Sequence, residues 1–260
     1  ALPICAAYPG LAAAARARGV LFSSTPFDEE SADMLVGLGM PFVKIASGDL
    51  THIPLLRHVG RFDLPVMLAT GMGTMNEIEV ALAAIGHRRV VLLQCTSAYP
   101  CPPDAVDLRA MVAMRERFGL PVGLSDHTEG IGAAVAAVAL GAVLIEKHFT
   151  SDRGLPGPDQ KMSADPAQWR ALTRAVREAE AALGTEEKRT RACEATTVHL
   201  ARRSLVAARD LPAGHVLGRT DLAVKRPGTG LAPALLDETV GRTLGKPVAR
   251  DQVLQENDLV

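Results

Sequence analysis

The chain has 260 residues, of which 48% are hydrophobic, and its formal net charge is −1. This is long enough for a large buried core, as one domain or as a large domain with a small one. The balanced charge, with no basic stretch, argues against a nucleic acid partner. No apolar run is as long as a membrane span, so we expect no membrane partner either.

Cysteine usage indicates a cytoplasmic, reducing compartment. The four cysteines, at positions 5, 95, 101 and 193, have no Cys-x-x-Cys spacing, which excludes a zinc knuckle or a redox pair of that type. Cys95 ends an apolar run and is therefore predicted to be an inert thiol in the core.

Short apolar segments alternate with helical segments from residue 11 to residue 184. The predicted helices cover residues 11–18, 29–38, 76–85, 108–118, 132–139 and about 165–184. The predicted strands cover residues 20–23, 42–45, 66–69, 90–95, 122–125 and 143–146. This alternation is typical of an α/β fold with a parallel sheet, and the spacing favours a TIM-type (β/α) barrel. A nucleotide-binding sheet is disfavoured because no Gly-x-Gly-x-x-Gly follows a strand.

A closed barrel has eight βα units, whereas the sequence provides six predicted strands. We therefore expect a barrel that lacks about two N-terminal βα units. The predicted organisation is a partial barrel at residues 1–184, a charged linker at 185–198 and a small, mostly β domain at 199–260. The small domain is predicted from short strands at 204–207, 222–224 and 243–248, which are separated by Pro and Gly turns.

Polar side chains gather where the predicted barrel strands end. They are Lys44, Ser47, Asp49, Thr70, Ser97, Tyr99, Ser125, Asp126, His127, Glu146, Lys147 and His148. Barrel enzymes carry their chemistry at the carboxyl ends of the strands. This set predicts a cup for an anionic, polyhydroxylated ligand, in which lysine and serine groups bind phosphate or carboxylate.

His127 and His148 follow consecutive predicted strands, with acidic residues nearby. Either histidine alone is more often structural, but together they favour a shared divalent metal. Two imidazoles leave coordination positions open for water and substrate. That arrangement suits Mn²⁺ or Mg²⁺ as a Lewis acid better than a closed structural zinc site.

The remaining ionisable residues leave alternatives open. Lys44 is the only lysine before Lys147 and lies in an apolar strand, so we expect it to bind an anion; a Schiff base with a carbonyl substrate is the alternative. Asp49 and Glu146 fit either acid–base catalysis or an ion pair. Asp126 fits either catalysis or the orientation of a neighbouring group.

Eight segments, in order along the chain, resemble the sialic acid synthase family, which includes N-acetylneuraminate, legionaminate and related nonulosonate synthases. They are FSSTPFD (22–28), KIASGD (44–49), TGM (70–72), CTSAYP (95–100), GLSDHT (123–128), IEKHFT (145–150), GPD (157–159) and KRPGTG (225–230). The resemblance implies a barrel followed by an antifreeze-protein-like SAF domain. It also implies a transferase that condenses phosphoenolpyruvate with an N-acyl hexosamine such as N-acetylmannosamine, in its open aldehyde form, and releases phosphate with C–O cleavage.

The resemblance also implies a role for each matching residue. His127 and His148 would hold the metal. Phosphoenolpyruvate would be bound by Lys44, Ser47 and Ser125, and the sugar by Asp49, Tyr99 and Asp159. Arg226 would contact the N-acyl group in the partner subunit of a domain-swapped homodimer, since a guanidinium offers several donors.

Three departures from the family pattern leave other functions open. Ala69 stands where some relatives have a phosphate-binding serine, and Ser97 stands where others have asparagine. The resemblance further implies two N-terminal units that carry a Glu and a Lys, which we expect to be missing from this barrel. One alternative is a non-catalytic remnant that binds sugar phosphates weakly. Another is a metal-dependent pyruvate aldolase in which Lys44 forms an imine.

Overall fold

The computed structural model describes residues 6–86 and 89–260, so Cys5 lies outside the described residues. The chain divides into two compact units, Ala1–Gly184 and Thr185–Val260. Among the described residues, no helix has both the length and the apolar character needed to cross a membrane.

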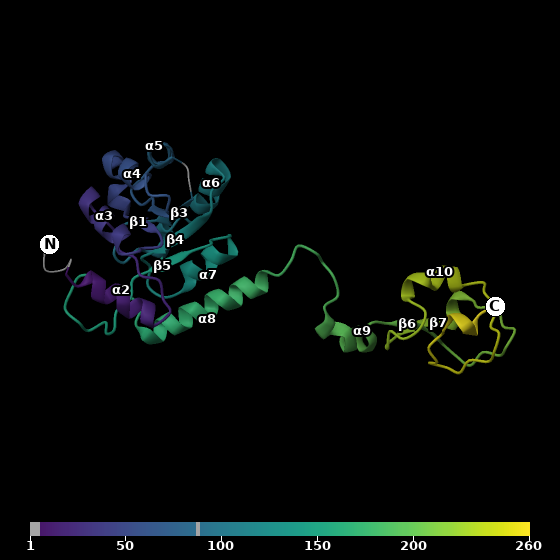
Figure 1. Ribbon diagram of the computed structural model, residues 1–260. Coiled ribbons are helices and arrows are strands. Elements are labelled where there is room, and N and C mark those ends of the chain that lie inside the picture. Colours follow the sequence, from purple (N-terminus) through teal and green to yellow (C-terminus); the bar gives the residue numbers. More distant parts are fainter. Residues whose placement is uncertain (1–5, 87–88) are drawn as a thin grey trace. The chain divides into compact units, whose positions relative to one another are not determined.

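The first unit is built on a parallel sheet of five strands in the order β1-β2-β3-β4-β5. The strands are β1 (Val43–Ile45), β2 (Val66–Ala69), β3 (Val90–Cys95), β4 (Val122–Asp126) and β5 (Ile145–Lys147). Each strand pairs with the next one along the chain, and the helices lie around the outside of the sheet (Figure 1). The curved, all-parallel sheet is a partial barrel, which confirms the predicted fold class.

Helices connect and flank these strands. They are α2 (Tyr8–Ala17), α3 (Glu29–Gly37), α4 (Ile53–Val59), α5 (Met75–Ile85), α6 (Leu108–Phe118), α7 (Gly132–Ala139) and α8 (Pro166–Leu183), with 3₁₀ turns at Ser47–Asp49 and Pro103–Ala105. Side-chain caps fix several starts: Thr74 begins α5 in a capping box with Glu77, and Asp165 begins α8 in one with Gln168. These bonds satisfy amide groups that have no partner inside the helix.

The core lies between the sheet and its helices. Val43, Ile45, Leu68 and Leu92 are each 0% exposed, and they alternate along the strands with residues of the other face. Burying a side chain of this size contributes about 1.5–3 kcal/mol. Because these residues must stay in the core, the residues between them must face the other side of the sheet.

The prediction of a strand at residues 20–23 is wrong. Val20 and Leu21 are 58% and 76% exposed and form no ladder. The Ser23 hydroxyl donates to the Phe42 carbonyl at 3.3 Å. The segment thus contacts its neighbour through a side chain and not through main-chain strand pairing. The helix α4 was not predicted, because it is only seven residues long.

The second unit contains a two-stranded antiparallel sheet, β6 (Ser204–Ala207) with β7 (Leu222–Lys225). Its helices are α9 (Ala195–Ala201) and α10 (Leu236–Thr239), with 3₁₀ turns at Ala192–Glu194, Arg219–Asp221, Pro233–Leu235 and Glu256–Asp258. Residues 195–198, expected in the linker, are the start of α9. Residues 243–248 form isolated bridges in place of the predicted strand. Gly245 and Pro247 explain the difference, since both residue types disfavour a continuous ladder.

Candidate active site

The structure brings His127 and His148 together. The sheet pairs Asp126 of β4 with Lys147 of β5, so the two histidines follow partnered residues. Their ring centroids are 5.2 Å apart. The ring of Tyr99 lies 4.3 Å from that of His127 and 5.9 Å from that of His148. Three residues predicted for the site therefore form one aromatic cluster at the carboxyl ends of the strands.

A hydrogen bond fixes the tautomer of His127. Its Nδ1 lies 3.2 Å from the carbonyl oxygen of Thr96. A carbonyl can only accept, so Nδ1 carries the proton, and in the neutral ring Nε2 keeps a free lone pair. This is how metal-binding histidines are usually oriented. The donor set therefore fits a divalent cation that binds through imidazole nitrogen.

His148 lies beside a carboxylate. Its Nδ1 lies 3.6 Å from Oδ2 of Asp159, whose side chain is half exposed. Burial, together with the charge of His127, lowers the pKa of His148. Within residues 6–86 and 89–260, no group of three or more His, Cys, Asp or Glu side chains is arranged to hold a metal ion. Any ion held by these two imidazoles would take its other ligands from water or substrate.

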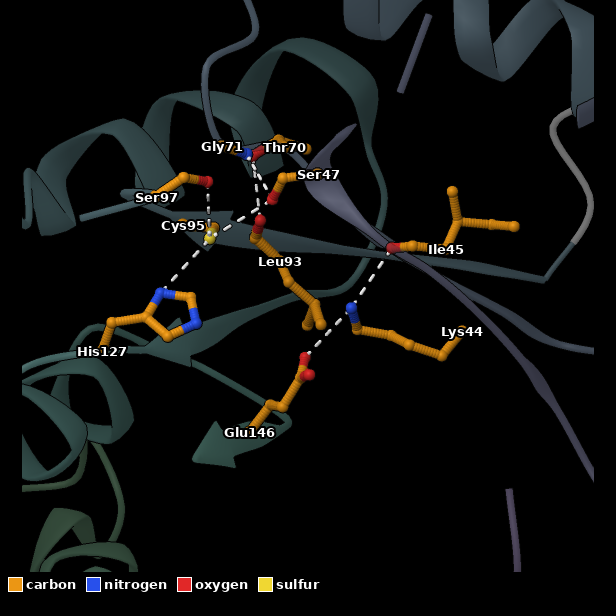
Figure 2. Close-up of polar contacts among 10 residues, drawn as sticks. All are labelled: Lys44, Ile45, Ser47, Thr70, Gly71, Leu93, Cys95, Ser97, His127 and Glu146. Carbon is orange, nitrogen blue, oxygen red and sulfur yellow. Dashed lines mark hydrogen bonds and ion pairs between the residues drawn. The ribbon is translucent and has the colours of Figure 1, made fainter. Parts of the chain in front are cut away.

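Lys44 and Glu146 form an ion pair across the site. Lys44 Nζ lies 3.3 Å from Glu146 Oε2, and the two side chains are 14% and 41% exposed. Nζ also donates to the Ile45 carbonyl at 3.2 Å. Figure 2 shows this pair opposite His127 and the serine groups. The lysine side chain of this pair is thus mostly buried, whereas the glutamate side chain is partly exposed.

Cys95 lies among residues predicted for the site. Ser47 Oγ donates to Cys95 Sγ at 3.3 Å and accepts from the Gly71 amide at 3.1 Å (Figure 2). Cys95 Sγ also lies 3.9 Å from Ser97 Oγ and 3.8 Å from His127 Nδ1. Burial raises the pKa of the thiol, but hydrogen bonds to His127 and Ser47 outweigh it, so the pKa is lowered. Burial has the opposite effect on His127 and lowers its pKa. The contacts with Cys95 outweigh burial, so the pKa of His127 is raised.

Asp126 is engaged within the protein. Its carboxylate accepts from the Thr128 amide at 2.9 Å, from the Thr128 hydroxyl at 2.7 Å and from Lys147 Nζ at 2.7 Å. Lys147 Nζ also donates to the Thr128 carbonyl at 2.7 Å. These partners fit the alternative in which Asp126 orients its neighbours.

The remaining predicted residues lie in β4, in the turn after β1 and in the second unit. Ser125 is buried in β4, with Cys95 and Glu146 as its partners on the neighbouring strands. Asp49 lies 3.8 Å from His52 Nδ1, in the turn after β1. Arg226 is exposed in the second unit, and its contact with the sugar of a partner subunit stays a prediction.

Sequence reasoning predicted an inert core thiol at Cys95 and listed Lys147 only among the polar groups at the strand ends, so it missed the contacts that these two residues make in the site. Both signals were present, because Cys95 ends a strand directly before Thr96 and Ser97, and Lys147 separates Glu146 from His148. Their partners, however, lie on neighbouring strands. The contact of Cys95 with Ser47 spans 48 positions in the sequence, and only the sheet brings the two together.

Comparison with known proteins identifies the family. The model of the NeuB family matches residues 5–188, and that of the SAF domain matches residues 202–260. The chain is 39% identical over 242 residues to the N,N'-diacetyllegionaminic acid synthase of Campylobacter jejuni, covering 91% of this chain and 72% of the relative. It is 43% identical over 237 residues to the synthase of the same name from Legionella pneumophila, covering 88% of this chain and 67% of the relative.

A solved structure agrees with these matches. The N-acetylneuraminic acid (sialic acid) synthetase of Leptospira borgpetersenii serovar Hardjo-bovis, in complex with citrate, is 33% identical. It superposes with a TM-score of 0.70, over 75% of this chain and 69% of that one. The chain therefore belongs to the NeuB family, with a SAF domain following its NeuB region.

Proposed function

We propose that this protein is a nonulosonic acid synthase, which condenses phosphoenolpyruvate with the open-chain aldehyde of an N-acyl hexosamine. In this reaction carbon 3 of phosphoenolpyruvate bonds to the aldehyde carbon, water adds to carbon 2, and the C–O bond to phosphate breaks. The observation that carries the proposal is the site itself: two imidazoles 5.2 Å apart, on the same sheet edge as the Lys44 ammonium, in a member of the NeuB family.

The anionic substrate is assigned to one side of the site. Lys44 offers a cation, and the hydroxyl of Ser47 and the amide of Gly71 lie within 3.1 Å of each other. Groups of this kind bind phosphate and carboxylate oxygens. Ser125 follows on the neighbouring strand. We assign phosphoenolpyruvate to these residues.

The sugar is assigned to the other side. Tyr99 is 54% exposed and stands over both histidines, and Asp159 lies beside His148. A phenol and a carboxylate are suitable partners for sugar hydroxyls. Glu146, which is partly exposed, is the group we assign to proton transfer.

Held by His127 and His148, Mn²⁺ or Mg²⁺ would supply Lewis-acid polarisation of the aldehyde oxygen. The chain's own residues orient this pair: the Thr96 carbonyl holds the ring of His127, and Asp159 faces that of His148.

A phosphate-release assay tests the proposal. Purified protein is incubated with phosphoenolpyruvate, MnCl₂ and either N-acetylmannosamine or a diacetylated hexosamine, and phosphate and the nonulosonic acid are measured. We expect stoichiometric release of both, which His148→Ala abolishes. His58→Ala is the control, because the His58 ring pairs with Glu29 and Asp33, which have no role in the proposed site. No release with any sugar, from protein shown to be folded and to bind Mn²⁺, would leave the remnant hypothesis standing.

The aldolase alternative makes a separate prediction. If Lys44 forms an imine, sodium borohydride with pyruvate will attach a three-carbon adduct to Lys44, which peptide mass spectrometry detects. We expect no adduct, because the ion pair with Glu146 fits Lys44 as an anion-binding group. An adduct on Lys44 would replace the synthase proposal with the aldolase.

A further inference from the structure

We propose that the Cys95 thiol is a positioning group that couples the predicted phosphoenolpyruvate-binding hydroxyl of Ser47 to the predicted metal-binding imidazole of His127. The proposal rests on the proposed function for its choice of ligands. Cys95 is 6% exposed and ends β3, and its sulfur lies within 4 Å of polar atoms of Ser47, Ser97 and His127.

Two hydrogen bonds hold the hydroxyl of Ser47. Its hydroxyl proton points to Cys95 Sγ at 3.3 Å, while its oxygen accepts the Gly71 amide at 3.1 Å. A hydroxyl rotates freely unless both of its functions are engaged. The thiol therefore fixes the direction in which the second lone pair of Ser47 is presented to a ligand.

The ring of His127 makes two contacts at its Nδ1 atom. Thr96 holds Nδ1 from one direction at 3.2 Å, and Cys95 Sγ contacts the same nitrogen at 3.8 Å. The carbonyl sets the tautomer, and the sulfur limits the rotation of the ring about its Cα–Cβ and Cβ–Cγ bonds. Groups that orient a ligand from behind typically change metal affinity tenfold to a hundredfold when removed.

Residue 71 is a glycine, and its backbone lies close to the same side chains. A Cβ on Gly71 would lie 2.5 Å from Ser97 Oγ, 2.8 Å from Ser47 Oγ and 3.0 Å from Cys95 Sγ. The backbone after β2 thus comes into direct contact with the three side chains. Such close packing leaves Cys95 no room to adopt another position without moving the serines.

Binding measurements test this without depending on turnover. Phosphoenolpyruvate is titrated by calorimetry with no sugar present, and Mn²⁺ binding is measured separately by electron paramagnetic resonance. We expect Cys95→Ala to weaken each by about tenfold or more. Cys101→Ala is the matched control: Cys101 is also buried, at 4% exposed, but its thiol donates to the Pro102 carbonyl. We expect it to leave both affinities within about twofold.

A double-mutant cycle shows whether Cys95 acts on phosphoenolpyruvate binding through Ser47. In a Ser47→Ala background, Cys95→Ala should weaken phosphoenolpyruvate binding no further, because its effect passes through the missing hydroxyl. The same substitution should still weaken Mn²⁺ binding, since the contact with His127 is separate. Fully additive effects on phosphoenolpyruvate binding would overturn the proposed coupling.

A second substitution at position 95 and a comparison with the control also test the role of the thiol. If Cys95→Ala does not fold, Cys95→Ser replaces it: its shorter Cβ–O bond draws the polar atom away from Ser47 and His127, and wild-type binding of both ligands would overturn the inference. Equal losses in the Cys95→Ala and Cys101→Ala variants would reduce Cys95 to a packing residue. Normal binding by the wild type without product formation would refute the proposed function alone and leave the role of the thiol to be judged from the affinities.

Discussion

Asp126 and Lys147 form a 2.7 Å ion pair in which the side chain of Asp126 is 0% and that of Lys147 is 3% exposed. The two residues are partners in the register of β4 and β5, and each directly precedes a histidine of the site. Because both charges are out of water, the pair persists only with full hydrogen bonding, which Thr128 completes. The ion pair thus joins the two strand ends from which His127 and His148 project.

Removing one partner of this pair should be costly. We expect Lys147→Met to lower the free energy of unfolding by about 3–5 kcal/mol, because Asp126 is left buried without its counter-ion. The measurement is urea denaturation. Arg177→Met is the control: Arg177 pairs with Glu180 at 2.8 Å on the exposed face of α8, where the loss should be about 1 kcal/mol or less. Equal losses of unfolding free energy in the two variants would show that the buried pair stabilises the protein no more than the exposed pair does.

The pattern of the sequence was enough for the barrel strands and for the rim on which the polar residues gather. The start of the last barrel helix was predicted at about residue 165 because polar capping residues before Pro166 are a local signal, and the structure has Asp165 as the cap. The contacts of Cys95 and Lys147 are different, since they depend on lateral register between strands. For residues 20–23 the sequence predicted a strand that the structure does not have. An apolar run forms a strand only where a neighbouring strand pairs with its main chain.

Replacing Gly71 should disturb the anion-binding groups more than the fold. Gly71→Ala places a methyl group against Ser47 and Ser97, so we expect phosphoenolpyruvate affinity to fall by about tenfold or more, as for other groups that orient ligands. Calorimetric titration measures it. Gly37→Ala is the control, because a Cβ there meets nothing within 4 Å. Unchanged affinity in Gly71→Ala would show that the pocket relaxes around the methyl group.

Asp221 should make the second unit sensitive to acid. The hydrogen bond with His215, followed by those with the Gly218 amide and Arg209, lowers the pKa of Asp221 to about 2. The unfolded chain, with an Asp pKa of about 3.9, binds the proton first as pH falls. The stabilisation is therefore complete above about pH 4 and is lost as the pH falls towards 2.

The variant Asp221→Asn isolates this contribution. We expect it to lower the free energy of unfolding by about 1.5–3 kcal/mol at pH 6, the usual value of hydrogen bonds to a charged group. The difference from the wild type should shrink between pH 4 and pH 2. Thermal unfolding followed by circular dichroism at a series of pH values measures it. A difference that stays constant down to pH 2 would contradict the lowered pKa.

Replacing Glu146, the carboxylate of the ion pair with Lys44, should affect catalysis much more than stability. Its side chain is 41% exposed, so its attraction to Lys44 is screened by water, and Glu146→Gln should change the free energy of unfolding by about 1 kcal/mol or less. If Glu146 transfers a proton, kcat should nonetheless fall by about a hundredfold or more. Glu129→Gln is the control, since Glu129 forms an exposed pair with Arg153 at 3.2 Å. A rise in KM for phosphoenolpyruvate with kcat unchanged would instead mean that Glu146 only holds Lys44 in position for the anion.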